Sequence, residues 1–186
     1  MKKVLLFLAD GLEECEGLIT VDLLRRAGVE VVTASLTDTV KVVSSHQIQI
    51  QADALLKDLD PEVFDMVVLP GGLKGTANLT ASQAVADICL SFAGRDDKQV
   101  AAICAAPSVL GLLGILKGKK ATCYPGWEEK LIGAEYTGET VTECGNVVTG
   151  KGMGATIPFA LHLIRRLVDE ETAVKVRDGI MYPFDF

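Results

Sequence analysis

The sequence predicts an α/β fold in which a mostly parallel β-sheet carries helices on both faces. Short apolar runs rich in β-branched residues, typical of buried parallel strands, alternate along the chain with longer amphipathic segments typical of helices. The 186 residues contain no repeat, linker or low-complexity segment. We therefore expect one domain over residues 1–186, which is long enough to bury a large core.

Strands are predicted where apolar, β-branched runs end in turn residues. In chain order these runs cover 3–9, 29–35, 64–69, 99–103 and 120–123, with a hairpin over 40–44 and 47–51 and a pairing of 140–144 with 146–149. The alternation in IQIQ leaves one face of the hairpin in water. Gly145 supplies the turn of the later pairing.

Helices are predicted where apolar residues recur at helical spacing between start and stop signals. These segments cover 14–27, 82–93, 108–116, 156–168 and 170–180. Ser82 is a candidate N-cap, and Gly28 follows the first helix as a stop. Pro158 lies in a first turn, where proline is tolerated.

Composition excludes several classes of protein. With 49% hydrophobic and 23% charged residues, the chain is globular rather than disordered. A net charge of −7 without a basic run argues against binding to nucleic acid or to anionic membranes, so we expect neither partner. The apolar run Val4–Ala9 is too short for a signal peptide or a membrane span, and Asp10 ends it.

Cysteine usage points to reduced thiols. The five cysteines are scattered, at 15, 89, 104, 123 and 144, with no CxxC and no cluster with histidine. The pattern predicts neither a disulfide framework nor a metal site. We expect a cytoplasmic protein.

Three of the predicted strands deliver chemically active residues to one edge of the sheet, because ligands bind at the carboxyl ends of parallel strands. The strands lead into ADGLEECEG (9–17), LPGGLKG (69–75) and AICAAP (102–107). Each motif also has a purely structural explanation. The carboxylates could form the acidic first turn of a helix, the glycines a tight turn, and the cysteine a small buried apolar residue.

The residues around Cys104 favour a nucleophile elbow, the sharp strand-to-helix turn that presents a reactive side chain. Such a turn needs small residues two positions before and after the nucleophile, and Ala102 and Ala106 occupy them. The start of the following helix is expected to favour the thiolate over the thiol. Gly71 and Gly72 would let backbone amides approach as oxyanion donors.

Taken together, AAICAAPSVLG, VVLPGG and DGLEECEG resemble the DJ-one/ThiJ/PfpI superfamily, and the resemblance runs from KVLLFLADG to KGMGATIPFAL near residue 160. It implies a flavodoxin-like sandwich, usually a homodimer. It also implies that Cys104 is the reactive cysteine, that Glu16 hydrogen-bonds to it, and that the backbone of Gly71 and Gly72 faces it.

The resemblance also suggests where a dimer would form. Arg25 and Arg26 match an arginine pair near the usual dimer contacts. Residues 14–28 and 47–51 are therefore the expected interface.

One position departs from the pattern. Some members place a histidine after the next strand, where this chain has Tyr124. His46 and His162 are expected at surface or half-buried positions, so a Cys-His-acid triad and a protease activity are not predicted.

Glu16 could take over the role of the missing base. A partly desolvated carboxyl group stays protonated more readily, and it could donate to sulfur and shuttle a proton. Tyr124 could add a hydroxyl donor, and Cys15 is expected to border the pocket.

Two functions remain open from the sequence. The first is a glyoxalase or deglycase that acts on reactive dicarbonyls such as methylglyoxal, without metal or nucleotide. Its oxyanion would be stabilised by the amides of Gly72 and Ala105. The second is an oxidative-stress-responsive redox sensor or chaperone that uses the same Cys104. Both need the elbow and Glu16, so these residues do not separate them.

Overall fold

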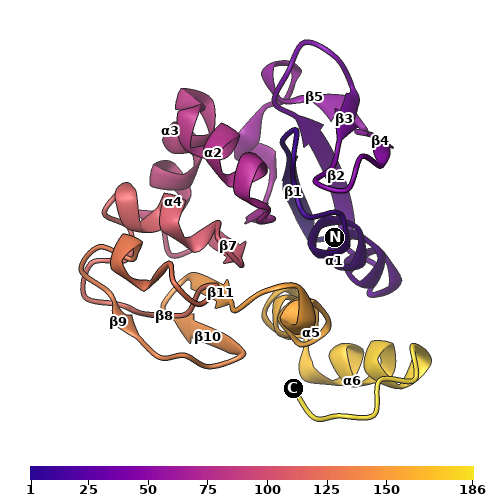
Figure 1. The fold of residues 1–186 in the computed structure, drawn as a ribbon. Helices are drawn as coiled ribbons and strands as arrows, with labels where there is room; N and C mark the ends of the chain where they lie inside the picture. Colours follow the sequence, from indigo (N-terminus) through magenta and orange to yellow (C-terminus); the bar gives the residue numbers. More distant parts are fainter.

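A seven-stranded sheet forms the centre of the computed structural model, which describes residues 1–186 (Figure 1). Its strand order is β10-β11-β7-β6-β1-β2-β5, and every neighbouring pair is parallel except β10 and β11. The strands are β1 (Lys3–Leu8), β2 (Glu30–Ser35), β5 (Ala54–Leu55), β6 (Met66–Leu69), β7 (Gln99–Ile103), β10 (Val141–Cys144) and β11 (Val147–Gly150).

Helices cover both faces of this sheet, as predicted. They are α1 (Glu14–Arg26), α2 (Leu73–Ala81), α3 (Gln83–Ala93), α4 (Pro107–Leu112), α5 (Thr156–Leu167) and α6 (Glu170–Gly179). Short 3₁₀ helices cover Leu56–Asp58, Pro61–Val63, Glu128–Lys130 and Met153–Ala155. No helix is both long and apolar enough to cross a membrane.

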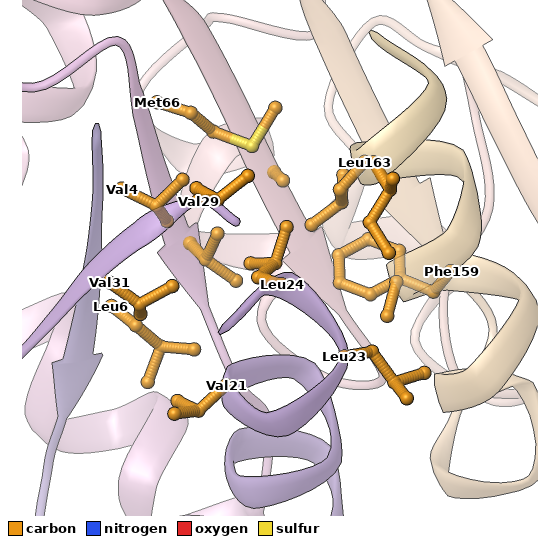
Figure 2. Packing of buried hydrophobic residues seen from close by; sticks show 14 of the residues in the cluster. Val4, Leu6, Val21, Leu23, Leu24, Val29, Val31, Met66, Phe159 and Leu163 are labelled. Carbon is orange, nitrogen blue, oxygen red and sulfur yellow. The ribbon is translucent and has the colours of Figure 1, made fainter. Parts of the chain in front are cut away.

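Two hydrophobic cores lie on opposite faces of the sheet because successive strand residues point to opposite sides. Leu6 of β1 belongs to the core under α1, α5 and α6, whereas its neighbour Phe7 belongs to the core under α2, α3 and α4. Figure 2 shows the first core, where Leu24 of α1 and Phe159 of α5 lie among the side chains of the sheet. This packing fixes the positions at which the strands end.

Two smaller sheets flank the main one. The predicted hairpin forms as β3 (Lys41–Val43) and β4 (Gln49–Gln51), and the later predicted pairing forms as β10 with β11. β8 (Lys120–Ala121) pairs instead with β9 (Glu135–Tyr136), which was not predicted, so the strand expected over 120–123 does not join the central sheet.

Two helices differ from the sequence expectation. The pattern does not predict α2, because its residues include glycine and threonine, which have modest helix propensity. The helix expected over 108–116 ends at Leu112, since Gly114 has a φ of +75° and turns the chain.

Candidate active site

Cys104 lies at a sharp turn between β7 and α4. Its φ is +66°, a conformation that is costly for a residue with a Cβ atom. Neighbouring segments hold it there: its N–H donates to the carbonyl of Gly150 at 2.9 Å, and its carbonyl accepts from the N–H of Tyr124 at 2.8 Å. Ala102 and Ala106 are both fully buried. This is the geometry of a nucleophile elbow.

Glu16, in the first turn of α1, brings a carboxyl group to this cysteine. The residue is 1% exposed. Its Oε2 accepts a hydrogen bond from the N–H of Gly71 at 2.8 Å, and its Oε1 is buried without a hydrogen-bond partner. Burial raises the pKa of Glu16 to about 7, against the lowering effects of Cys104 and the Gly71 amide. Glu16 can therefore hold a proton near neutral pH.

The thiol of Cys104 is not acidified as the helix position suggested. Burial raises its pKa, and the charge of Glu16 raises it further, to about 12, although the amides of Gly72 and Ala105 act in the opposite direction. α4 is only six residues long and begins with Pro107, which has no N–H to offer the sulfur.

Cys104 and Glu16 titrate as a coupled pair, because each group's charge opposes ionisation of the other. When the proton is on Glu16, the carboxyl group no longer repels a thiolate and its O–H can donate to sulfur. The reactive form is then the protonated acid beside the thiolate.

The two glycines of the PGG turn have different roles. The N–H of Gly71 is engaged by Glu16, so the expectation that it donates to an oxyanion does not fit the geometry. A Cβ atom at Gly71 would lie 2.7 Å from the Cβ of Cys104 and 2.7 Å from Oε2 of Glu16. The absence of a side chain at Gly71 is what lets acid and thiol meet.

Gly72 supplies an amide that faces the sulfur, as does Ala105. Its φ is +89°, and a Cβ atom there would lie 2.4 Å from the carbonyl oxygen of Gly11. These two amides are the available oxyanion donors beside Cys104.

A cavity of about 640 Å³ opens over the cysteine at the carboxyl ends of the strands. Tyr124 lines it, as expected. Cys15 is not among the lining residues, which corrects the expectation that it borders the pocket. Burial and the neighbouring carboxylates also raise the pKa of the Cys15 thiol.

His46 lines the same cavity, which the sequence did not indicate. The loop between β3 and β4 reaches the start of α1, where the N–H of Ser45 donates to the carbonyl of Leu12 at 2.8 Å. Nδ1 of His46 lies 2.7 Å from Oε1 of Glu14. No spacing in the sequence links these segments, so only the fold reveals this histidine.

One group in the structure has the spacing of metal ligands. Single ligand atoms of Glu13, Glu14 and His46 lie within 4.8 Å of one another. Each already has a hydrogen-bond partner within this loop contact, since Ser45 Oγ donates to both carboxylates.

His162 lies away from the cavity, at the half-buried position expected for it. It contacts Glu143 of β10, which also binds Arg165 and Arg166 of α5. This network joins the edge of the sheet to a helix and adds nothing to the chemistry at Cys104.

Sequence and structure comparisons agree on one family. Residues 2–166 match the DJ-1/PfpI family. The Parkinson disease protein 7 homolog of Danio rerio is 38% identical over 180 residues, which cover 95% of each chain. The glutathione-independent glyoxalase DJR-1.2 of Caenorhabditis elegans is 32% identical over 86% of this chain and 84% of its own. Protein DJ-1 homolog B of Arabidopsis thaliana is 40% identical over 94% of this chain, which spans only 40% of that longer protein.

Solved structures give the same result. A DJ-1 superfamily protein from Salmonella typhimurium, solved as a cysteine-to-alanine mutant, has a TM-score of 0.94 and 38% identity, with 99% of this chain and 100% of that one covered. The oxidized DJ-1 of Toxoplasma gondii has a TM-score of 0.94 and 34% identity, with the same coverage. The fold is therefore the flavodoxin-like α/β sandwich of these proteins.

Proposed function

Because the chain belongs to the DJ-1/PfpI family and sets a buried carboxyl group against an elbow cysteine, we propose that it is a cofactor-independent glyoxalase acting on methylglyoxal and related dicarbonyls. The observation that carries this proposal is the position of the buried Glu16 carboxyl group beside the elbow cysteine, where burial raises the pKa of Glu16 to about 7. A group with that pKa can both give and take a proton at neutral pH. The similarity to a protein named as a glutathione-independent glyoxalase supports the same reaction.

The reaction begins with the proton on Glu16 and the charge on sulfur. The thiolate of Cys104 attacks the aldehyde carbon, a C–S bond forms, and the carbonyl oxygen takes the proton from Glu16 to give a hemithioacetal. The amides of Gly72 and Ala105 stabilise the oxygen while its negative charge develops. The hydroxyl of Tyr124, at the side of the cavity, is a further donor to the substrate.

Glu16, now ionised, removes the proton from the former aldehyde carbon to give an enediolate. It returns this proton to the ketone carbon, while the hydroxyl proton of the hemithioacetal moves to the former ketone oxygen. The product is a lactoyl thioester. Water then cleaves the C–S bond, which releases lactate and restores the thiol. The former aldehyde carbon is oxidised and the ketone carbon is reduced within one molecule, so only water is consumed.

A turnover assay with methylglyoxal, read out as lactate, tests the proposal. Cys104→Ser should lose essentially all activity. Glu16→Gln should lose about 10²–10⁴-fold, the usual contribution of general acid–base catalysis. Cys144→Ser removes another partly exposed thiol, remote from the cavity, and should retain full activity. Wild-type lactate production by Cys104→Ser would refute this mechanism.

A redox sensor is the second candidate, and the partnerless Oε1 of Glu16 favours it. A sulfinic acid on Cys104 would bring oxygen atoms to which a protonated Glu16 could donate. Mild peroxide should then oxidise Cys104 before the other thiols, as read by mass spectrometry. Selective oxidation in a protein that makes no lactate would favour the sensor over the glyoxalase.

A further inference from the structure

The cavity over Cys104 is larger than methylglyoxal requires. Its volume of about 640 Å³ falls within the range of roughly 300–1,000 Å³ that is typical of pockets for drug-sized ligands. Methylglyoxal carries only one methyl group beyond its two carbonyls. Most of the cavity would remain filled with water while the smaller substrate reacts.

Exposed apolar side chains form one part of the cavity wall. Leu73, Tyr124 and Met153 are 71%, 51% and 54% exposed, and all three line the cavity. They come from the start of α2, the loop after β8 and the segment before α5. The Tyr124 ring lies against the backbone next to Met153, since a Cβ atom at Gly152 would be 3.3 Å from Cδ2 of the ring. Single exposed apolar residues are ordinary, but a group around one cavity marks a binding surface.

Charged side chains also line the cavity, and carboxyl groups outnumber basic groups among them. Asp10, Glu13 and Glu16 are the carboxyl groups of the lining, and Lys74 and His46 are its basic side chains; Glu16 contributes a negative charge only after it has given up its proton. Asp10 is fixed there, because its Oδ1 accepts from the N–H of Val43 at 2.9 Å. An excess of carboxyl groups disfavours anionic ligands, and it favours departure of a carboxylate once it has formed.

We propose that the site selects neutral α-oxoaldehydes with an apolar substituent, such as an arylglyoxal, over methylglyoxal, and discriminates against anionic α-oxo acids. This selectivity rests on the glyoxalase function proposed above. Leu73, Tyr124 and Met153 are the specificity-determining residues. The chemistry is the same: phenylglyoxal and water give mandelate, with oxidation of the aldehyde carbon and reduction of the ketone carbon.

The first test compares kcat/KM for phenylglyoxal and methylglyoxal. The wild-type ratio should favour phenylglyoxal by about tenfold or more, because an apolar pocket discriminates on that scale between groups of different size. Leu73→Ala and Met153→Ala should each lower this ratio several-fold. Leu112→Ala is the matched control, since Leu112 is similarly exposed on α4 but does not line the cavity, and it should leave the ratio unchanged. A ratio below one, or one that neither cavity variant changes, overturns the proposal.

The second test does not depend on turnover. Alkylation of Cys104 is measured with iodoacetanilide, iodoacetamide and iodoacetate, each rate being divided by that of a free thiol. Iodoacetanilide should react fastest and the anionic iodoacetate slowest, and Met153→Ala should reduce the advantage of iodoacetanilide. If dicarbonyls are converted but this order is absent, the selectivity is wrong and the glyoxalase stands. If the order holds but no dicarbonyl is converted, the pocket chemistry stands and the glyoxalase function is wrong.

Discussion

Cys104 and Glu16 lie next to each other in a largely buried site. When the pair holds a single proton, that proton can sit either on the Glu16 carboxyl group or on the Cys104 sulfur. The carboxyl group has a pKa raised to about 7 and the thiol a pKa raised to about 12, mainly because both are removed from water. The first proton that the pair loses therefore leaves near neutrality, and part of the resulting population is the thiolate beside protonated Glu16. The pH dependence of the reactivity of Cys104 should therefore follow the titration of the coupled pair and not the pKa of an isolated cysteine.

Alkylation by iodoacetamide should reveal this coupling. We expect the rate at Cys104 to rise through pH values near 7 and then level off, as thiolate accumulates in the singly protonated pair. Cys104 should also be the first of the five cysteines to be modified at neutral pH. Peptide mapping over a pH series measures both, and Glu16→Gln should remove the inflection near 7. Earlier modification of Cys15 or Cys123 would count against the elbow.

Glu16 should also lower the stability of the protein at higher pH. Its pKa is raised from 4.5 to about 7 in the folded state, so the folded protein binds this proton more tightly than the unfolded chain. The free energy of unfolding should then fall as pH rises from about 4.5 to about 7, by on the order of 3 kcal/mol.

Urea denaturation of wild type and Glu16→Gln at about pH 5 and about pH 8 checks this. The variant cannot ionise, so its stability relative to wild type should increase between the two pH values. If the difference in stability between wild type and Glu16→Gln is the same at both pH values, Glu16 does not titrate as described.

Among the structural elements, the loop between β6 and α2 depends on glycine. A Cβ atom at Gly72 would lie 2.4 Å from the oxygen of Gly11 and 2.6 Å from the nitrogen of Glu13, and backbone atoms cannot move aside at low cost. Gly114 has a similar φ, +75°, but nothing lies within 4 Å of its Cβ position. The two positions therefore share backbone strain and differ in crowding.

We expect Gly114→Ala to lower the free energy of unfolding by about 1–2 kcal/mol, from backbone strain alone. Gly72→Ala should cost about 1–3 kcal/mol more through overpacking, and it should slow alkylation of Cys104 because the Gly72 amide faces the sulfur. Denaturation midpoints and alkylation rates measure the two effects. Equal stability losses in the two variants would contradict the crowding argument.

Glu143 connects the antiparallel edge of the sheet to α5. Its Oε1 lies 2.6 Å from Arg165 Nη2 and its Oε2 lies 2.8 Å from Arg166 Nη1. Burial alone would raise the pKa of Glu143, but the hydrogen bonds from His162 and the two arginines lower it to about 2. Its stabilising effect is therefore present above about pH 4.5 and is lost as pH falls towards 2.

Glu143→Gln should destabilise the protein near neutral pH by about 1–2 kcal/mol, because the site is partly exposed. The loss of stability in Glu143→Gln should become smaller as the pH falls. By contrast, the stability of Glu16→Gln relative to wild type should fall as the pH is lowered. Thermal or urea unfolding across the acid range measures this. If the loss of stability in Glu143→Gln does not change with pH, the ion pairs of Glu143 are not the cause of that loss.

At the level of the whole molecule, we propose that the chain forms a homodimer through α1 and the β3–β4 hairpin. The hairpin lies against the start of α1, since Oγ of Ser45, in the hairpin loop, donates to Oε2 of Glu14 at 3.1 Å (Figure 1). Leu18 and Ile48 each leave over 40% of their surface exposed there (42% and 48%), which suits a contact with a second copy.

Light scattering at micromolar concentration should give the mass of a dimer. Ile48→Asp should shift the equilibrium towards monomer, because it would bury a charge in the contact. Leu90→Asp is the matched control, since Leu90 is similarly exposed but lies on α3, across the sheet. A monomeric wild type, or equal effects of the two variants, would contradict this interface.

Local patterns in the sequence determined the alternation of strands and helices and the position of the elbow. Apolar periodicity depends on neighbouring residues, and the small residues around Cys104 satisfy a steric rule that operates within a few positions. The acidic motif that contains Glu16 was placed at the end of a predicted strand in the same way, but the resemblance to the family was what distinguished Glu16 from its neighbouring carboxylates. The helix α2 escaped detection, since its packing overrides modest propensity.

Only the tertiary structure decided the electrostatics of the site. The raised pKa of Glu16 depends on burial, and the engagement of the Gly71 amide depends on contact between segments 55 positions apart. His46 reached the cavity through a hairpin contact that no periodicity encodes. Desolvation and hydrogen bonding between distant segments exist only once the chain has folded. The sequence therefore predicted that Glu16 holds its proton more readily, but not that burial raises the pKa of the Cys104 thiol.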